Sequence, residues 1–289
     1  MQYQRPDALV STEWLALHLA DKDLRVVDGT YIIPPSTRDA RQEFDARHIP
    51  GAVFFDIDEV CDQANPLPHM LPKPAAFSSA ARKLGLGDGS RIVAYDTHGM
   101  VTAARVWWMF RIFGHKNVAV LDGGLPKWIK ESRQTVGTET GSAAGALAAR
   151  HFTARFNKNL LRDIAQIKAN LDKRQEQVVD ARSAGRFKAI DPEPRVGLRG
   201  GHMPGALNLP YTELLDPADK TFLSADRLAA RFQTAGIDMQ KPIVTSCGSG
   251  VTACVLALGL YLLGRDDVAV YDGSWTEWGG RKDTPIVTD

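Results

Sequence analysis

The segment Ile243-Val244-Thr245-Ser246 is followed by Cys247-Gly248-Ser249-Gly250-Val251-Thr252 and then by an apolar run that stops at Gly264. A short β-branched run, a turn punctuated by glycines and an apolar run of helical length are typical of a strand, a tight loop and a helix. We therefore expect a strand–loop–helix unit in which Cys247 is the first residue of the loop and the helix begins near Val251.

The expected loop has the composition of an anion-binding site. Glycines at 248 and 250 let the backbone curl so that N–H groups point inward, and the first N–H groups of a helix have no partner within it. Such a ring of donors stabilises an anion, here the thiolate of Cys247. Cysteines at helix N-termini commonly react as thiolates near neutral pH. We predict that Cys247 is a nucleophile, the alternative being a small buried apolar side chain, which is the role expected for Cys254.

The chain contains two copies of one unit. Four segments recur in the same order at a nearly constant offset: 26–28 and 178–180, 48–52 and 202–206, 92–96 and 243–247, and 118–123 and 268–273. The repeat predicts a duplicated α/β domain, each copy with a mainly parallel sheet covered by helices on both faces. We expect helices over residues 11–20, 78–84, 101–113 and 159–171. Segment 137–145 consists of small and polar residues, which is the composition of a linker. The predicted domains are therefore residues 1–145 and 146–289.

The repeat also separates the two copies by their chemistry. The first copy has Asp96 where the second has Cys247, and a carboxylate cannot form a persulfide. In parallel sheets, ligands bind beyond the carboxyl ends of the strands, which is where both loops are expected to lie. We therefore predict that the second domain is catalytic and that the first supplies one wall of a cleft between them.

Composition excludes several classes of function. In 289 residues, 35 Lys and Arg balance 34 Asp and Glu, which gives no support for nucleic acid or an anionic membrane as a partner. Three widely spaced cysteines favour a reducing compartment over a disulfide framework, and no cysteine–histidine cluster suggests a metal. We see no secretory signal, and the longest apolar run has 13 residues where a bilayer needs about 20. These features predict a soluble cytoplasmic protein.

The tandem copies, the acidic residue in place of the first cysteine and the sequence of the second loop together resemble the two-domain rhodanese family over about residues 8 to 280. Within the family, the loop is similar to that of members that use 3-mercaptopyruvate. Thiosulfate-using relatives typically carry cationic residues where Gly248 and Ser249 stand. The resemblance implies sulfur transfer from 3-mercaptopyruvate, through a Cys247 persulfide, to a thiophilic acceptor such as thioredoxin, a small thiol or cyanide. It implies no metal and no organic cofactor.

Three other functions remain as alternatives. The same fold could use thiosulfate as the donor, or the protein could be a non-catalytic sulfur carrier. A cysteine-dependent phosphatase needs an arginine about six residues after the nucleophile, where this chain has Ala253.

The resemblance also implies roles for individual residues. Arg186 and Arg195 would bind the carboxylate and keto oxygen of the donor, since planar guanidinium groups suit an α-keto acid. Asp58, His69 and Ser249 would form a relay that handles the thiol proton of the substrate. The rest of the substrate-binding loop is expected to be Gly248, Gly250, Val251 and Thr252.

Several other polar residues are expected to have structural roles. The arginines at 182, 199 and 281 are interpreted as solvated surface residues. The duplicated His48 and His202 are expected to stabilise turns, and the duplicated Asp28 and Asp180 to brace loops through backbone hydrogen bonds. Asp122 and Asp272 precede glycine and indicate turns, and Cys61 is given no role.

Overall fold

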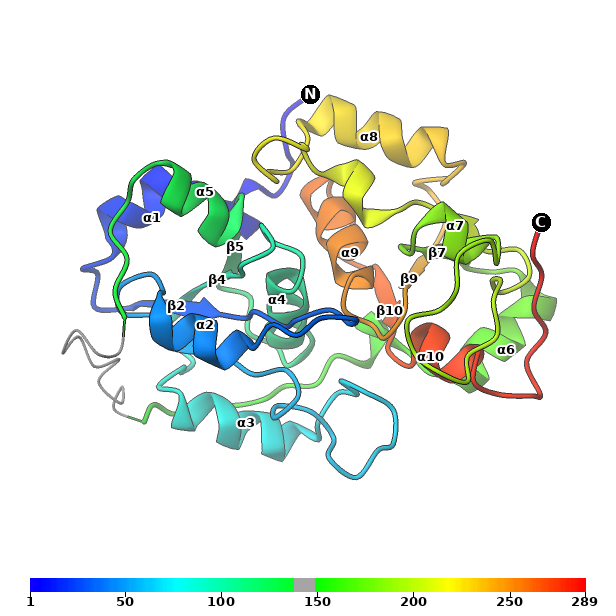
Figure 1. Ribbon diagram of the computed structural model, residues 1–289, viewed down its shortest axis with the longest axis horizontal. Coiled ribbons are helices and arrows are strands. Elements are labelled where there is room, and N and C mark those ends of the chain that lie inside the picture. Colours follow the sequence, from blue (N-terminus) through cyan, green and yellow to red (C-terminus); the bar gives the residue numbers. More distant parts are fainter. Residues whose placement is uncertain (138–148) are drawn as a thin grey trace.

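The computed structural model describes residues 1–137 and 149–289, and Figure 1 shows them as two similar halves. Segment 138–148 lies outside the described residues, and the predicted boundary at residue 145 lies within it.

The two halves are built from the same ten elements in the same order. The first contains β1 (Leu9–Val10), α1 (Thr12–His18), β2 (Leu24–Asp28), α2 (Ala40–Ala46), β3 (Val53–Phe54), α3 (Pro74–Lys83), β4 (Arg91–Tyr95), α4 (Ala103–Ile112), β5 (Val118–Leu121) and α5 (Gly124–Lys130). The second contains β6 (Leu161–Arg162), α6 (Ile164–Lys173), β7 (Gln177–Asp180), α7 (Ala184–Phe187), β8 (Leu207–Asn208), α8 (Ala225–Thr234), β9 (Ile243–Ser246), α9 (Ala253–Leu262), β10 (Ala269–Tyr271) and α10 (Ser274–Trp278).

Each half forms one five-stranded sheet. The strand orders are β1-β5-β4-β2-β3 and β6-β10-β9-β7-β8, so corresponding strands take corresponding places. All pairs in both sheets are parallel. The predicted duplicated α/β fold with parallel sheets is therefore confirmed.

The starts of two helices, α3 and α6, differ most from the prediction. Helix α3 starts at Pro74 and not at residue 78, because a proline in the first turn needs no N–H partner and its fixed φ suits a helix. The helix expected from residue 159 starts at Ile164, after Asp163 and Gln166 form a capping box. Residues 161–162, placed in that helix, instead form β6, which pairs with β10.

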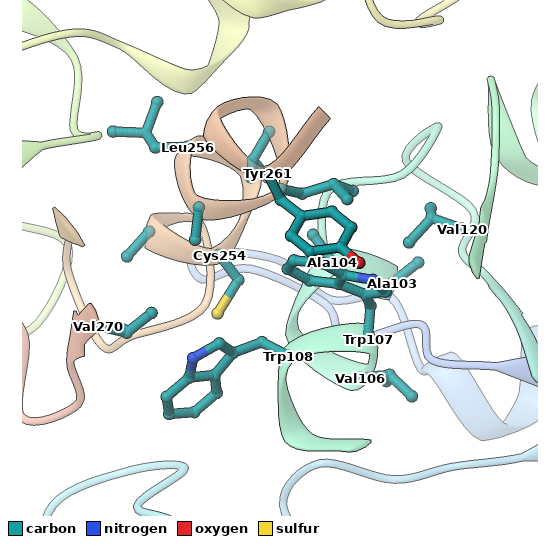
Figure 2. Packing of buried hydrophobic residues seen from close by; sticks show 14 of the residues in the cluster. Ala103, Ala104, Val106, Trp107, Trp108, Val120, Cys254, Leu256, Tyr261 and Val270 are labelled. Carbon is teal, nitrogen blue, oxygen red and sulfur yellow. The ribbon is translucent and has the colours of Figure 1, made fainter. Parts of the chain in front are cut away.

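The two halves meet along α4 and α9, the helices that follow the two equivalent loops, which lie next to each other between the sheets (Figure 1). Figure 2 shows this contact, in which the rings of Trp107 and Tyr261 meet edge to face with centroids 5.3 Å apart. Cys254 is fully buried in the same cluster, as predicted, and burial raises the pKa of its thiol well above the usual range. One apolar core thus joins the two halves.

The aspartates that directly follow β5 and β10 also join the halves. Oδ1 of Asp122 accepts a hydrogen bond from the backbone N–H of Phe222 at 2.9 Å, and Oδ2 of Asp272 accepts one from Leu71 at 2.8 Å. Each carboxylate therefore reaches from its own half to the other. The interpretation of these residues as turn signals was too narrow, because sequence spacing does not show contacts between domains.

The duplicated histidines and the aspartates of β2 and β7 have the predicted structural roles. His48 stacks on Phe44 and His202 on Phe187, and in each case Nδ1 contacts the carbonyl oxygen of the same phenylalanine. Asp28 and Asp180 each accept a hydrogen bond at 2.9 Å from the backbone N–H two residues on.

Among the described residues, no helix is long and apolar enough to cross a membrane. The same residues contain no cluster of three or more His, Cys, Asp or Glu side chains arranged to hold a metal ion.

Candidate active site

A cavity of about 250 Å³ lies between the halves, beyond the carboxyl ends of β7 and β9. The second half supplies most of its wall, and Tyr31, Ile33 and Pro34 from the loop after β2 supply the rest. Its lining includes the following predicted site residues: Cys247, Gly248, Ser249, Val251, Thr252, Arg186 and Arg195. The structure thus brings together seven residues that the sequence placed in one site, whereas Gly250, Asp58 and His69 do not line this cavity.

Cys247 is the first residue after β9, and its side chain is buried at the cavity wall with 2% of the residue exposed. The hydroxyl of Ser274 holds the loop, because its Oγ accepts hydrogen bonds of 3.1 Å from the backbone N–H groups of both Cys247 and Gly250. Ser274 has a left-handed φ of 48°, and Gly124 has a φ of 55° at the same place in the first half. A serine therefore bears backbone strain here that its counterpart avoids, and uses its side chain to fix the cysteine loop.

The equivalent loop of the first half shows what this backbone can bind. The carboxylate of Asp96 accepts five backbone N–H hydrogen bonds at 2.6–3.0 Å, from residues 98, 99, 100, 102 and 103. In the second half, Ser249, Val251 and Ala253 correspond to residues 98, 100 and 102. Their backbone N–H groups form no hydrogen bond with the described part of the chain. The loop of Cys247 therefore offers unused donors to an anion.

The two predicted arginines flank this loop. A Cβ atom added to Gly248 would lie 3.2 Å from Nη2 of Arg186 and 4.0 Å from Nη1 of Arg195. Nη2 of Arg195 also donates to the hydroxyl of Tyr31 at 3.4 Å. Burial raises the pKa of Tyr31 above its ordinary value, so the phenol is a neutral group of the cavity wall at neutral pH. Two cationic groups thus face a loop that carries no cation of its own.

The interpretation of Arg182 as a solvated surface residue was wrong. Arg182 is buried in the wall of the cavity, where it donates to the carboxylates of Asp180 and Glu193. Arg199 is exposed, as that interpretation expected, but its guanidinium also donates to backbone carbonyl groups of residues 278, 279, 281 and 284. The sequence does not reveal these contacts, because Glu193 and the carbonyl groups bound by Arg199 lie on other loops, and only Asp180 is close to Arg182 in the sequence.

Asp58 and His69 contact each other in a loop of the first half. Nδ1 of His69 lies 2.6 Å from Oδ1 of Asp58, but the angles at this contact are not those of a hydrogen bond, and both buried ring nitrogens lack an aligned partner among the described residues. The imidazole packs edge-on against Tyr31, with centroids 4.5 Å apart. The structure therefore joins two of the three predicted relay residues, and no hydrogen bond links His69 to Ser249.

Arg105, which was not among the predicted site residues, connects the His69 loop to the cysteine loop. It projects from α4 and is fully buried. Its Nη1 donates to Oδ1 of Asp272 at 2.6 Å and to the carbonyl oxygen of Gly250 at 3.2 Å, and its Nη2 donates to the carbonyl oxygen of His69. One side chain of the first half thus fixes both loops that contain predicted catalytic residues.

Comparisons with known proteins agree with this architecture. The model of the rhodanese-like domain matches residues 11–131 and 163–281. A 3-mercaptopyruvate sulfurtransferase from Homo sapiens is 45% identical over 277 residues, which cover 94% of this chain and 91% of the relative. A thiosulfate sulfurtransferase from Bos taurus is 43% identical over 278 residues, with coverage of 94% and 91%.

The crystal structure of SseA from Escherichia coli, a 3-mercaptopyruvate sulfotransferase, has a TM-score of 0.83 and 39% sequence identity to this chain, and the match covers 93% of this chain and 98% of that one. Because the family model matches both halves and the relatives align over nearly the full length, this chain belongs to the rhodanese family.

Proposed function

We propose that the protein is a sulfurtransferase that takes sulfur from 3-mercaptopyruvate, carries it as a persulfide on Cys247 and passes it to a thiophilic acceptor, with release of pyruvate. The observation that carries this proposal is the pair of equivalent loops. One binds the carboxylate of Asp96 with five backbone N–H groups, and the other has Cys247 in the same position.

The likeness between the Asp96 loop and the Cys247 loop favours a persulfide over a bare thiolate as the anion bound in the second half. A carboxylate oxygen of aspartate is three bonds from Cα, and the outer sulfur of a cysteine persulfide is also three bonds away, whereas the thiolate sulfur is only two. A backbone of the same design therefore suits the outer sulfur. The free N–H groups of Ser249, Val251 and Ala253 are the donors that would stabilise its charge.

The cavity favours an α-keto acid as the donor. Arg186 and Arg195 lie beside Gly248, on the side from which a substrate would approach Cys247. Guanidinium groups bind planar carboxylates through paired hydrogen bonds. The bovine relative acts on thiosulfate, so overall identity does not decide between the donors. Gly248 and Ser249 carry no charge, so the loop itself offers no cation to the doubly charged thiosulfate, and this favours mercaptopyruvate as the donor.

The first half-reaction balances without a metal or redox cofactor. The Cys247 thiolate attacks the sulfur of mercaptopyruvate, an S–S bond forms, and the C–S bond breaks. The electron pair of that bond goes to the substrate carbon, which leaves as the enolate of pyruvate. The proton of the donor thiol ends on the methyl group of pyruvate, so the enzyme needs only to move this proton.

Asp58, His69 and Ser249 are the groups we propose for that transfer. Ser249 lines the cavity, and the carboxylate of Asp58 contacts the His69 ring, where it would orient the imidazole. The missing contact between Ser249 and His69 means that substrate binding, or a rotation of the serine hydroxyl, must complete the relay.

In the second half-reaction, a thiolate or cyanide attacks the outer sulfur and the Cys247 thiolate leaves. Thioredoxin, small thiols and cyanide are all acceptors that this chemistry allows. We further propose that the protein works in a reducing compartment such as the cytoplasm, because Cys61, Cys247 and Cys254 are all free.

Steady-state and single-turnover kinetics test the proposal. We expect pyruvate release from mercaptopyruvate at a higher kcat/KM than sulfur transfer from thiosulfate, and a loss of roughly a hundredfold or more in Arg186→Ala. His69→Gln should slow pyruvate release but not the removal of sulfur from a preformed persulfide by cyanide. A higher kcat/KM for thiosulfate would overturn the choice of donor, and equal slowing of both half-reactions would overturn the relay.

A further inference from the structure

Arg186 does not stand alone in the cavity wall. Its Nη2 donates to Oε2 of Glu193 at 2.6 Å and its Nε to Oε1 at 3.2 Å. The side chain of Glu193 is only 2% exposed, whereas that of Arg186 is 23% exposed. The carboxylate is therefore a buried anchor for a cation that faces the cavity.

Glu193 is held in turn by Arg182. Nη1 of Arg182 donates to Oε1 of Glu193 at 2.7 Å, and its Nε and Nη2 donate to the carboxylate of Asp180 at 2.6–3.1 Å. The side chains of Asp180 and Arg182 are both fully buried. A chain of alternating charges thus runs from the end of β7, through Arg182 and Glu193, to Arg186.

The first half lacks this chain at the equivalent place. Thr30 stands where Arg182 does, two residues after the buried aspartate of β2. Asp28 keeps the hydrogen bond from the backbone of Thr30, but no described arginine pairs with its carboxylate. Only the half with Cys247 therefore has the arginine that connects β7 to the cavity, which argues for a role in the reaction over a general role in the fold.

From this geometry we propose that Glu193, fixed by Arg182, is a positioning residue that sets the orientation in which Arg186 receives the carboxylate of the sulfur donor. The inference rests on the proposed function. Glu193 occupies the Nε–Nη2 edge of the guanidinium, so Nη1 and the remaining N–H of Nη2 are the donors left for substrate. Arg186 then presents one defined edge to the cavity, without the loss of side-chain entropy that a free arginine would undergo on binding.

The test is Glu193→Gln, which keeps the size of the side chain and removes its charge. We expect KM for mercaptopyruvate to rise roughly tenfold or more with a smaller change in kcat, because a charge-assisted contact that orders Arg186 is lost. Mercaptoacetone, which has the keto and thiol groups of the donor but no carboxylate, should be used with equal kcat/KM by wild type and variant. A purely structural role of Glu193 would lower activity on both donors alike.

Glu176→Gln is the matched control. Glu176 accepts hydrogen bonds from Nε and Nη2 of Arg162 in the same half, away from the cavity, and its variant should keep the wild-type KM. Thermal unfolding identifies any variant that does not fold. Glu193→Asp is the second test: it keeps the charge but shortens the side chain by one methylene, so the carboxylate no longer reaches Arg186. We expect this variant to raise KM as well. An unchanged KM in either folded variant, or equal losses on both donors, overturns the inference. Absence of pyruvate release by the wild type would instead overturn the proposed function.

Discussion

At the scale of single residues, Asp28 and Asp180 show how one substitution between the copies changes the state of a buried carboxyl group. Asp180 is paired with Arg182, whereas Asp28 has only the backbone N–H of Thr30 and nearby hydroxyl groups. Burial raises the pKa of Asp28 from 3.8 to about 6, although hydrogen bonds from Thr30 and Tyr95 oppose the change. The first half therefore contains a carboxylate that is costly to ionise.

This difference predicts the pH dependence of stability for Asp28→Asn. Because the pKa of Asp28 is higher in the folded chain than in the unfolded chain, the folded state binds more protons between about pH 4 and pH 6. The contribution of Asp28 to the free energy of unfolding is fully present below about pH 4 and is lost as the pH rises through about 6. Relative to wild type, the variant should gain up to roughly 3 kcal/mol in free energy of unfolding between pH 4 and pH 7.

Urea denaturation of both proteins at several pH values measures that gain. Asp180→Asn is the control, and it should be destabilised because Arg182 would lose one of its two buried carboxylate partners. A difference between Asp28→Asn and wild type that does not change with pH would contradict the account.

The residues that sequence reasoning found are those whose chemistry is local. Cys247 and the glycines of its loop form a contiguous motif, and Arg186 and Arg195 belong to one short segment. Glu193 lies in that same segment but carries no mark of its role, since a carboxylate beside two arginines is usual on a surface. Its function depends on the burial of Arg182, which only the folded chain reveals.

At the scale of elements, the strand–loop–helix unit was predictable because its parts differ strongly in composition. The prediction placed the start of α9 near Val251, and the helix begins at Ala253. The two-residue strands β1 and β6 were not identified, because two residues cannot show an alternating pattern. These strands are defined by their pairing with β5 and β10, which no local signal records.

The loops that complete the site were the least predictable elements. Tyr31, Ile33 and Tyr211 line the cavity, yet Tyr31 and Ile33 lie in an irregular loop and Tyr211 begins a short 3-10 helix (Tyr211–Leu214), and the sequence of both segments only indicates a loop. Their position follows from topology: the loop after β2 lies across the domain boundary, and Tyr211 follows β8. A rule that ligands bind beyond the carboxyl ends of parallel strands finds the region but not the residues.

At the scale of the whole molecule, the domain without a nucleophile is part of the site. Arg105 of α4 pairs with Asp272 and donates to the carbonyl groups of Gly250 and His69. The repeat predicted a supporting wall, and the structure adds a buried ionic connection between the halves. Sequence alone could not find it, because Arg105 lies inside an apolar helix with no local partner.

Arg105→Met tests this connection. Removing one partner of a buried pair leaves Asp272 uncompensated, so the free energy of unfolding should fall by about 3–5 kcal/mol. Arg111→Met, on the same helix, removes a guanidinium that lies over the ring of Tyr261, and its effect should be clearly smaller. Chemical denaturation gives both values, and a loss below about 1 kcal/mol for Arg105→Met would show that the connection adds little to stability.

The central claim, that sulfur is carried on Cys247, is tested most directly by intact mass spectrometry of the protein after reaction with mercaptopyruvate alone. We predict a product heavier by one sulfur atom, which cyanide removes, in wild type and in the controls Cys61→Ser and Cys254→Ser. Cys247→Ser should show no such adduct. An adduct that survives in Cys247→Ser, or none in the wild type, would contradict the account.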